Sequence, residues 1–365
     1  RSGLHALGFL SDADRIQVPQ LVVNTWGDQT VGDTLALAEH WRRVDPHGAG
    51  ASQRVVIAPG DHCDFEDAGR LERFGELPLS NATRPWNDWY QRWFDHWLAG
   101  KGEGLASMPA YTFFMVGENR WFESAQWPPA EALRERLYLA SGGQANSRAG
   151  DGRLLSEPSR SPGEPPRSPG EPPVSAMQDQ FTYDPLNPVP SRGGPVWALS
   201  ADVGYRVGPV DQREVETRDD VLVYTGEPLA ADLRIAGPIE ARIVFSSSVP
   251  DTDLVARLVD VAPDGRALNI QEGALRLRYR DGFEAPAMME RGRSYAVRID
   301  MRAIAYRVPK GHRLRLQVTS SSFPRLERNL NTGGVNADET RAVKAQNTVH
   351  HGPAMRSWVQ FHRLP

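Results

Sequence analysis

The sequence of 365 residues contains one cysteine, Cys63, and lacks any long apolar run. A single cysteine excludes an internal disulfide and a metal site built from several cysteines. No stretch approaches the roughly 18 consecutive apolar residues of a membrane-spanning helix. Acidic and basic residues nearly balance, with a net charge of -4. The sequence therefore gives no reason to expect nucleic acid or a membrane as a partner. It leaves the compartment open between cytoplasm and export.

The first part of the chain, residues 1–104, alternates strand and helix patterns. Apolar runs of strand length occupy residues 20–26 and 54–58, and the second run ends at a Pro-Gly pair. Asp33 precedes a helical pattern over 34–44 and is predicted to be its N-cap. Aromatic residues recur at helical spacing over 86–98. This alternation predicts a parallel sheet with helices packed on it.

The second part, residues 105–365, has a strand pattern almost throughout. Apolar residues alternate with polar ones over 239–245 and again over 313–318. Short strands separated by Gly, Pro and Asp turns indicate a sandwich or jelly roll. Within this part, residues 156–173 carry RSPGEPP twice in tandem, which predicts an exposed loop. We expect an α/β domain over 1–104 and an all-β domain over 105–365.

Two polar loops follow the two predicted parallel strands. Asp28 comes after the first strand and His62 after the second. Ligands and catalytic groups collect at the carboxyl ends of parallel strands, so both side chains are expected at one edge of the sheet. An aspartate that orients a histidine is the acid-base pair of a serine hydrolase. Nearby carboxylates compete for the acid role: Asp33, Asp61 and Asp64.

Three further patterns allow other chemistry, and each has a structural explanation. Cys63 adjoins His62 and could replace a serine nucleophile, although a buried cysteine is often a core filler. A short loop gathers the possible metal ligands His62, Asp64 and Glu66. A calcium site or simple turn chemistry would explain an acidic series around a predicted hairpin, and we favour the turns. That series consists of Asp251, Asp253, Asp260 and Asp264.

Several blocks resemble one known family and follow its order along nearly the whole chain. They include VPQLVVNTWGDQTVGDT (18–34), VVIAPGDH (55–62), WYQRWFDHWLAGKGEG (89–104), MVGENRWFESAQWPP (115–129), YDPLNPVPSRGG (183–194) and QNTVHH (346–351). The family is the serine hydrolases of the cocaine esterase and X-prolyl dipeptidyl-peptidase type. The resemblance implies a partial α/β-hydrolase domain followed by a jelly-roll, galactose-binding-like β-sandwich.

The resemblance also implies roles for individual residues. Asp28 matches the family's triad acid and His62 its general base. Thr30 stands where family members often place an aromatic residue of the acyl pocket, and Trp197 is the candidate for a pocket wall from the β domain. The presence of Thr30 in place of that aromatic residue puts any substrate preference carried over from the family in doubt. The chain also has Gly27 where the family usually has tyrosine, a change that removes no catalytic group.

The chain lacks the serine elbow of an α/β-hydrolase. No serine has a glycine both two before and two after it, and Ser52 comes nearest, with Gly50 before it but Arg54 after it. We therefore expect the nucleophile outside this chain, in a missing N-terminal half, and no turnover by the chain alone. The first sheet would then expose an unpaired, aggregation-prone edge.

The predicted activity is hydrolysis of a small ester or amide through an acyl-enzyme, as an esterase, acylase or X-prolyl dipeptidyl-peptidase-like enzyme. No cofactor and no metal is implied, and a homo-oligomer is a further expectation. The alternative is a binding or assembly module of galactose-binding type without catalysis. The loops of Asp28 and His62 favour the hydrolase, since a binding module does not need them.

Overall fold

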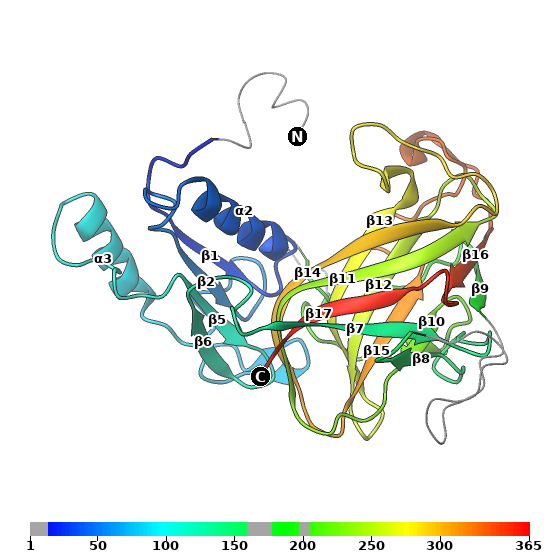
Figure 1. Cartoon of the computed structure of the whole chain (residues 1–365), viewed down its shortest axis with the longest axis horizontal. Helices are drawn as coiled ribbons and strands as arrows, with labels where there is room; N and C mark the ends of the chain where they lie inside the picture. Colours follow the sequence, from blue (N-terminus) through cyan, green and yellow to red (C-terminus); the bar gives the residue numbers. More distant parts are fainter. Residues whose placement is uncertain (1–13, 159–176, 197–204) are drawn as a thin grey trace.

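The computed structural model describes residues 14–158, 177–196 and 205–365. The tandem RSPGEPP repeat and Trp197 lie outside these residues. Two regions stand side by side in Figure 1, each built on its own sheet. The first has a four-stranded sheet in the order β1-β2-β5-β6, and the second has an 11-stranded sheet. Among the described residues, no helix is long and apolar enough to cross a membrane.

The elements follow one another in this order along the chain. The first region and its connections contain β1 (Leu21–Thr25), α2 (Val31–Val44), β2 (Arg54–Ala58), β3 (Arg73–Phe74), β4 (Leu77–Pro78), α3 (Trp86–Trp97), β5 (Tyr111–Met115) and β6 (Arg120–Ser124). The sandwich contains β7 (Leu133–Ala140), β8 (Arg153–Leu155), β9 (Gln178–Tyr183), β10 (Leu222–Thr225), β11 (Leu233–Ser247), β12 (Asp253–Val261), β13 (Ala267–Arg276), β14 (Tyr295–Val308), β15 (Arg313–Thr319), β16 (Ala345–His350) and β17 (Trp358–Leu364). Three short 3-10 helices cover Val215–Thr217, Leu277–Tyr279 and Asn336–Asp338.

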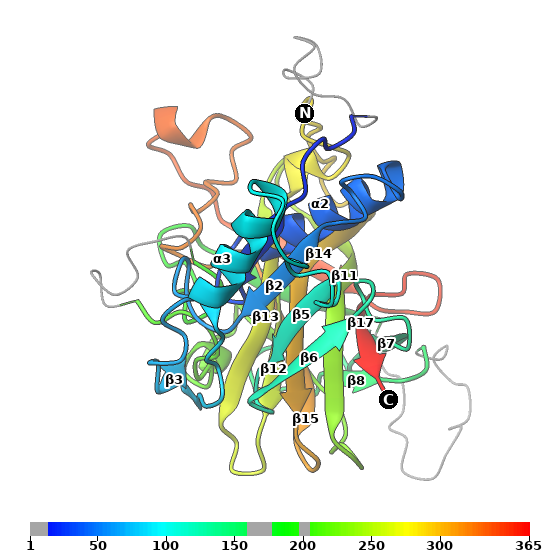
Figure 2. The same cartoon turned by 90° about the vertical axis from the view of Figure 1, so that its left-hand side faces the viewer.

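Helices cover both faces of the first sheet. Successive side chains of a strand point to opposite faces, so each strand contributes to two apolar layers. β1, β2 and β5 are parallel, and β6 is antiparallel to β5. Val55 and Ile57 of β2 belong to the core that includes Leu35 of α2. Val56, between them, packs with Trp86 of α3 on the other face. Figures 1 and 2 show the two helices on the two sides of this sheet.

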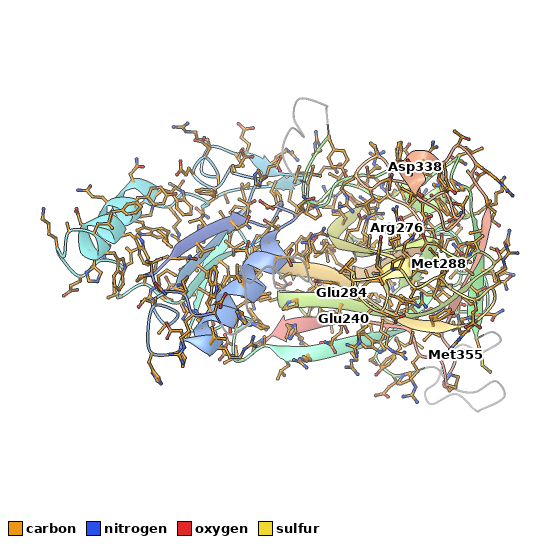
Figure 3. All side chains as sticks on the ribbon, turned by 90° about the horizontal axis from the view of Figure 1, so that it is seen from above. Glu240, Arg276, Glu284, Met288, Asp338 and Met355 are labelled. Atoms are coloured by element: carbon orange, nitrogen blue, oxygen red, sulfur yellow. The ribbon has the colours of Figure 1, made fainter. Side chains whose placement is uncertain are left out.

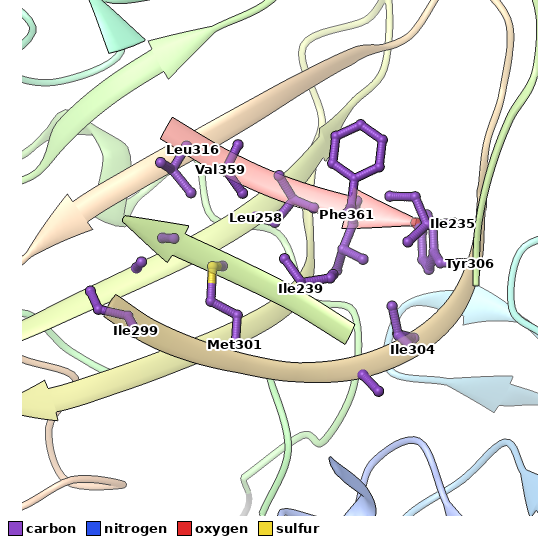
Figure 4. Close-up of a cluster of buried hydrophobic side chains, with 14 of the residues drawn as sticks. Ile235, Ile239, Leu258, Ile299, Met301, Ile304, Tyr306, Leu316, Val359 and Phe361 are labelled. Carbon is purple, nitrogen blue, oxygen red and sulfur yellow. The ribbon is translucent and has the colours of Figure 1, made fainter. Parts of the chain in front are cut away.

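The second region is a β-sandwich with a continuous apolar core. Its sheet runs β13-β12-β15-β10-β8-β7-β17-β11-β16-β9, and β14 pairs with β11. Alternate residues of β11 point inward, and Ile239, Ile243 and Phe245 are at most 1% exposed. Figure 4 shows Ile239 facing Met301 of β14 in this core. The alternation predicted over 239–245 and 313–318 is therefore present in β11 and β15.

The two regions are joined by backbone hydrogen bonds as well as by packing. Val116, after β5, donates to the Ala305 carbonyl at 2.9 Å and accepts from the Arg307 amide at 2.8 Å. These bonds attach the end of β5 to β14. One hydrophobic cluster contains buried side chains from both regions. The hydrogen bonds and this shared core together fix the first sheet against the sandwich.

The predicted elements of the first part match the structure except at one helix start. The strands at 20–26 and 54–58 are β1 and β2, and the aromatic helix is α3. The N-cap prediction for Asp33 is wrong: α2 begins at Val31, and Asp33 lies in its first turn. Thr30 occupies the N-cap position without a side-chain cap. A carboxylate in the first turn still favours the helix through its dipole. The boundary at 104 stays a prediction, while β5 and β6 beyond it complete the first sheet.

Candidate active site

The loops of Asp28 and His62 lie side by side at the carboxyl ends of β1 and β2. Ladder pairing continues beyond the strands, because Trp26 donates to the Ala58 carbonyl and Gly27 to the Gly60 carbonyl, both at 3.0 Å. The two loops therefore leave the sheet in register. The sequence prediction that both side chains meet at one sheet edge is confirmed by their direct contact.

Gly27 is required by the close approach of these loops. A Cβ atom at position 27 would lie 2.3 Å from the Gly60 carbonyl oxygen, and Val207 of the sandwich would be 2.8 Å away. Gly60 has φ +115°, a conformation that side chains rarely adopt. The approach of the Gly60 carbonyl and of Val207 leaves no room for a side chain at position 27, which gives a physical reason for glycine there instead of tyrosine.

Asp28 is buried and uses both of its carboxylate oxygens. Oδ2 contacts Nδ1 of His62 in a short hydrogen bond. Oδ1 accepts from the Thr30 backbone N–H at 2.6 Å and from the Thr30 hydroxyl at 2.7 Å. The backbone contact closes an Asx turn, which fixes the carboxylate relative to the start of α2. The Asp28 side chain is 4% exposed and the His62 side chain 28% exposed. The ring can therefore be reached from solvent while its carboxylate partner is shielded.

The hydrogen bonds of Asp28 keep it ionised in spite of its burial. Burial alone raises the pKa of a carboxyl group. The bonds from Thr30 and His62 stabilise the charged form more strongly, so the pKa of Asp28 lies below its ordinary value. A carboxylate that stays charged on the Nδ1 side of an imidazole stabilises the protonated ring and favours one tautomer of the neutral ring.

Thr30 belongs to the loop of residues 26–30, between β1 and α2, which carries Asp28 and is called the acid loop below. Further contacts hold Thr30 in place. Its hydroxyl donates to Asp28 and accepts from Asn24 Nδ2 at 3.2 Å, and Asn24 also donates to Thr34 at 2.8 Å. The predicted place of Thr30 in an acyl pocket stays a prediction. Sequence reasoning missed the contact with Asp28, although a threonine two residues after an aspartate is the spacing of an Asx turn.

The carboxylates that compete with Asp28 for the acid role lie elsewhere or have other partners. Asp61 accepts the backbone N–H of His62 at 2.7 Å, and its carbonyl accepts from Thr25 at 2.8 Å, so it shapes the turn. Burial, followed by the charge of Asp61, raises the pKa of Asp64. Cys63 is exposed with φ 66°, so the expectation of a buried core filler is wrong.

The proposed metal ligands do not form a cluster in the described part of the chain. No group of three or more His, Cys, Asp or Glu side chains there is placed to hold a metal ion. Glu66 accepts from the Tyr90 hydroxyl at 2.8 Å. In the acidic series, Asp251 pairs with Arg278 at 2.8 Å and Asp253 with Arg276 at 2.9 Å. Asp264 lies in the turn between β12 and β13, where it accepts from the Arg266 amide.

A family model, a curated relative and solved structures all resemble this chain. Residues 103–360 match the X-Pro dipeptidyl-peptidase C-terminal non-catalytic domain. The chain is 35% identical to the cocaine esterase of Rhodococcus sp. (strain MB1 Bresler) over 343 residues, which is 93% of this chain and 55% of that protein. An aminopeptidase structure from a marine sediment Thaumarchaeota archaeon superposes with a TM-score of 0.78 and 26% identity, covering 97% of this chain and 56% of the other.

An α-amino acid ester hydrolase structure has the same fold, with a TM-score of 0.79 and 24% identity over 96% of this chain and 56% of the other. The chain thus spans about half the length of the relatives it matches. The domain match covers residues 103–360, and the likeness to cocaine esterase covers 93% of the chain. The chain belongs to the cocaine esterase and X-prolyl dipeptidyl-peptidase family of serine hydrolases.

Proposed function

We propose that this chain supplies the acid and the base of a Ser-His-Asp triad that hydrolyses esters or amides. Asp28 is the acid, His62 is the base, and the serine comes from outside these 365 residues. The observation that carries the proposal is the contact of the buried Asp28 carboxylate with Nδ1 of the partly exposed His62. Family membership supports the reaction class.

The geometry suits proton transfer at the far side of the imidazole. With Asp28 bound at Nδ1, the neutral ring carries its proton there, and Nε2 is the basic nitrogen. The serine hydroxyl attacks the substrate carbonyl while Nε2 takes its proton, and the same proton passes to the leaving alcohol or amine. Water then repeats the sequence on the acyl-enzyme and releases the acid. None of these steps needs a cofactor.

The first region fits the role of an incomplete α/β-hydrolase domain, and the sandwich fits a jelly roll. Support for the first assignment comes from three parallel strands with helices on both faces and functional loops at their carboxyl ends. The order of acid before base along the chain is also that of α/β-hydrolases. The missing Gly-x-Ser-x-Gly elbow and the coverage of about half of each relative support a serine outside the chain.

Fluorophosphonate labelling of the purified protein tests the proposal, with intact masses measured for every polypeptide present. The proposal predicts label on a serine outside residues 1–365 and loss of that label in His62→Gln. The matched control is His47→Gln, which changes an exposed histidine of the same region. Label on a serine within the 365 residues, or labelling that persists in His62→Gln, would refute it. The galactose-binding-like alternative stays a prediction that titration with simple sugars tests.

A further inference from the structure

A β-bulge on sandwich strand β14 directs one side chain toward the acid loop. Pro238 of β11 pairs with Ala303, but Glu240 pairs with Asp300. One residue of β11 therefore opposes two of β14, and Arg302 is one of those two. Bulges commonly reorient a side chain near a functional site.

The backbone of Arg302 adopts a conformation that disfavours arginine. Its φ is +63°, in the left-handed region that glycine and asparagine enter at much lower cost. A side chain held in this region points to a structural or functional demand that outweighs the local strain. The Asp300 carboxylate supports the turn by accepting the Arg302 backbone N–H at 2.7 Å.

The guanidinium of Arg302 ties the acid loop to the sandwich. Nε donates to the Gln29 carbonyl at 2.9 Å, and Nη1 donates to the Glu272 carbonyl of β13 at 2.6 Å. Gln29 is the central residue of the Asx turn between Asp28 and Thr30. A Cβ atom on Gly32, at the start of α2, would lie 3.4 Å from the Arg302 Cα, so the two backbones are in close contact.

From these contacts we infer that Arg302 is a positioning residue for the catalytic acid: it holds the Gln29 carbonyl and thereby sets the direction of the Asp28 carboxylate toward His62. The inference rests on the proposed function of the pair. It gives the sandwich, which matches a non-catalytic domain, a direct part in the geometry of the triad. Arg302 acts on the Asp28–His62 pair through its bond to the Gln29 carbonyl.

The charges around Arg302 are compatible with this role. Burial lowers the pKa of the guanidinium, while the carboxylates of Asp300, Asp33 and Asp28 favour its charged form. The Arg302 charge therefore faces α2, its own strand and the acid loop at once. A second bond from the sandwich reaches the same loop, because Val196 donates to the Gly27 carbonyl at 2.9 Å.

The substitution Arg302→Lys tests the hydrogen-bond geometry of the guanidinium separately from its positive charge. Arg302→Lys keeps the positive charge, but lysine lacks the planar guanidinium that donates to the Gln29 and Glu272 carbonyls at the same time. The readout is the low-field proton NMR signal of an imidazole N–H that donates to a carboxylate, recorded on the whole protein at low temperature. His62→Gln and Asp28→Asn identify that signal by removing it. Arg298→Lys is the matched control on the same strand, where the exposed arginine pairs with Glu240, labelled in Figure 3.

The inference expects Arg302→Lys to weaken or shift the His62 signal and Arg298→Lys to leave it unchanged. Where labelling locates the serine, Arg302→Lys should also slow labelling by up to about a hundredfold, the effect of a misplacement near 1 Å. An unchanged signal in folded Arg302→Lys overturns the inference but leaves the pair intact. Absence of any His62 signal in the parent protein refutes the proposed pair itself, so the two failures are distinguishable.

Arg302→Asn is a second variant that tests the inference if Arg302→Lys does not fold. Asparagine tolerates the left-handed backbone but cannot reach Gln29. We expect it to retain the thermal unfolding midpoint of the parent or exceed it, and still to lose the signal. A signal preserved in Arg302→Asn would show that the acid loop holds its position without the guanidinium, and the inference would be wrong.

Discussion

Each of the two regions of the molecule contains an aspartate in contact with a histidine, and the Asp28–His62 and Asp179–His351 pairs differ in exposure. In the first region, Asp28 meets His62 at the sheet edge, and the histidine side chain is 28% exposed. In the sandwich, Asp179 meets His351 at 3.0 Å, and both side chains are at most 1% exposed. The residue types are the same, so the difference between the pairs lies in position and geometry.

The sandwich pair even includes a serine. Ser141, after β7, donates to both oxygens of Asp179 at 2.8 Å and lies 2.9 Å from Nε2 of His351. Tyr224 of β10 donates to the same carboxylate at 2.8 Å, and the Ala145 amide does so at 2.9 Å. These contacts connect the ends of several sandwich strands. We refer to Ser141, Asp179, Tyr224 and His351 as the buried cluster.

The comparison shows why residue types alone do not define a triad. In a working triad the carboxylate and the serine bind opposite nitrogens of the imidazole, so the proton can be taken on one side and stabilised from the other. In the buried cluster, Ser141 and Asp179 share the single atom Nε2 of His351. Asp28 occupies Nδ1 of His62 instead. The arrangement in the buried cluster stabilises the fold, and the arrangement of Asp28 and His62 suits proton transfer.

Exchanging each histidine for glutamine gives the largest expected contrast. His62→Gln should lower the rate of fluorophosphonate labelling by about 10⁴-fold, as loss of a triad function does. His351→Gln should leave the labelling rate of the folded protein unchanged, since its ring is buried in the sandwich and bonded to Ser141 and Asp179. Rates are measured by intact mass at a series of times. Equal losses in both variants would erase the functional distinction between the pairs.

The reverse contrast is expected for stability. Asp179→Ala removes the acceptor of four buried groups and should lower the free energy of unfolding by about 3–5 kcal/mol. Asp28→Ala should cost only about 1 kcal/mol, because water can reach the partners left at the sheet edge. Urea unfolding followed by tryptophan fluorescence and circular dichroism measures both. A larger loss in Asp28→Ala would mean that the acid loop, and not the buried cluster, carries the stability.

The sequence predicted local elements well where one pattern dominated. β2 was predicted to the residue because Arg54–Ala58 is a short apolar run ended by Pro59 and Gly60. The start of α2 was missed because Asp33 looks like a cap, whereas the Asx turn of Asp28 already starts the helix at Val31. The Asp28–His62 contact was predictable because both residues directly follow neighbouring parallel strands.

The remaining features depend on contacts between distant residues. Ser141, Asp179 and His351 are separated by 38 and 172 positions, and no local pattern connects them. Arg302 lies in a strand pattern that gives no sign of a bulge, because the irregularity arises from its pairing with β11. Such groups become visible only when the register of the sandwich strands is known.

The two carboxylates should also respond to acid in the same direction. Burial raises the pKa of both Asp28 and Asp179, yet their hydrogen bonds lower each below the ordinary value. An unfolded aspartate has a pKa near 3.9, so below about that pH the unfolded state binds more protons and stability falls as pH drops through the folded values. Urea midpoints across acidic pH should therefore fall less steeply in Asp179→Asn and in Asp28→Asn than in the parent. Unchanged slopes in both variants would contradict the lowered pKa values.

The smallest effects come from removing one hydroxyl at a time. Thr30→Val keeps the backbone N–H that bonds Asp28 but removes the hydroxyl, and Ser141→Ala removes the matching hydroxyl of the buried cluster. A hydrogen bond to a charged group contributes about 1.5–3 kcal/mol, and less where water can replace the donor. Thr30→Val should therefore slow labelling by no more than about tenfold with little change in the urea midpoint, since the Asx turn remains. Ser141→Ala should lower the midpoint and leave labelling unchanged. If Thr30→Val instead reduced labelling as much as His62→Gln does, the hydroxyl would be aligning the acid, and the turn and Arg302 together would not suffice to position Asp28.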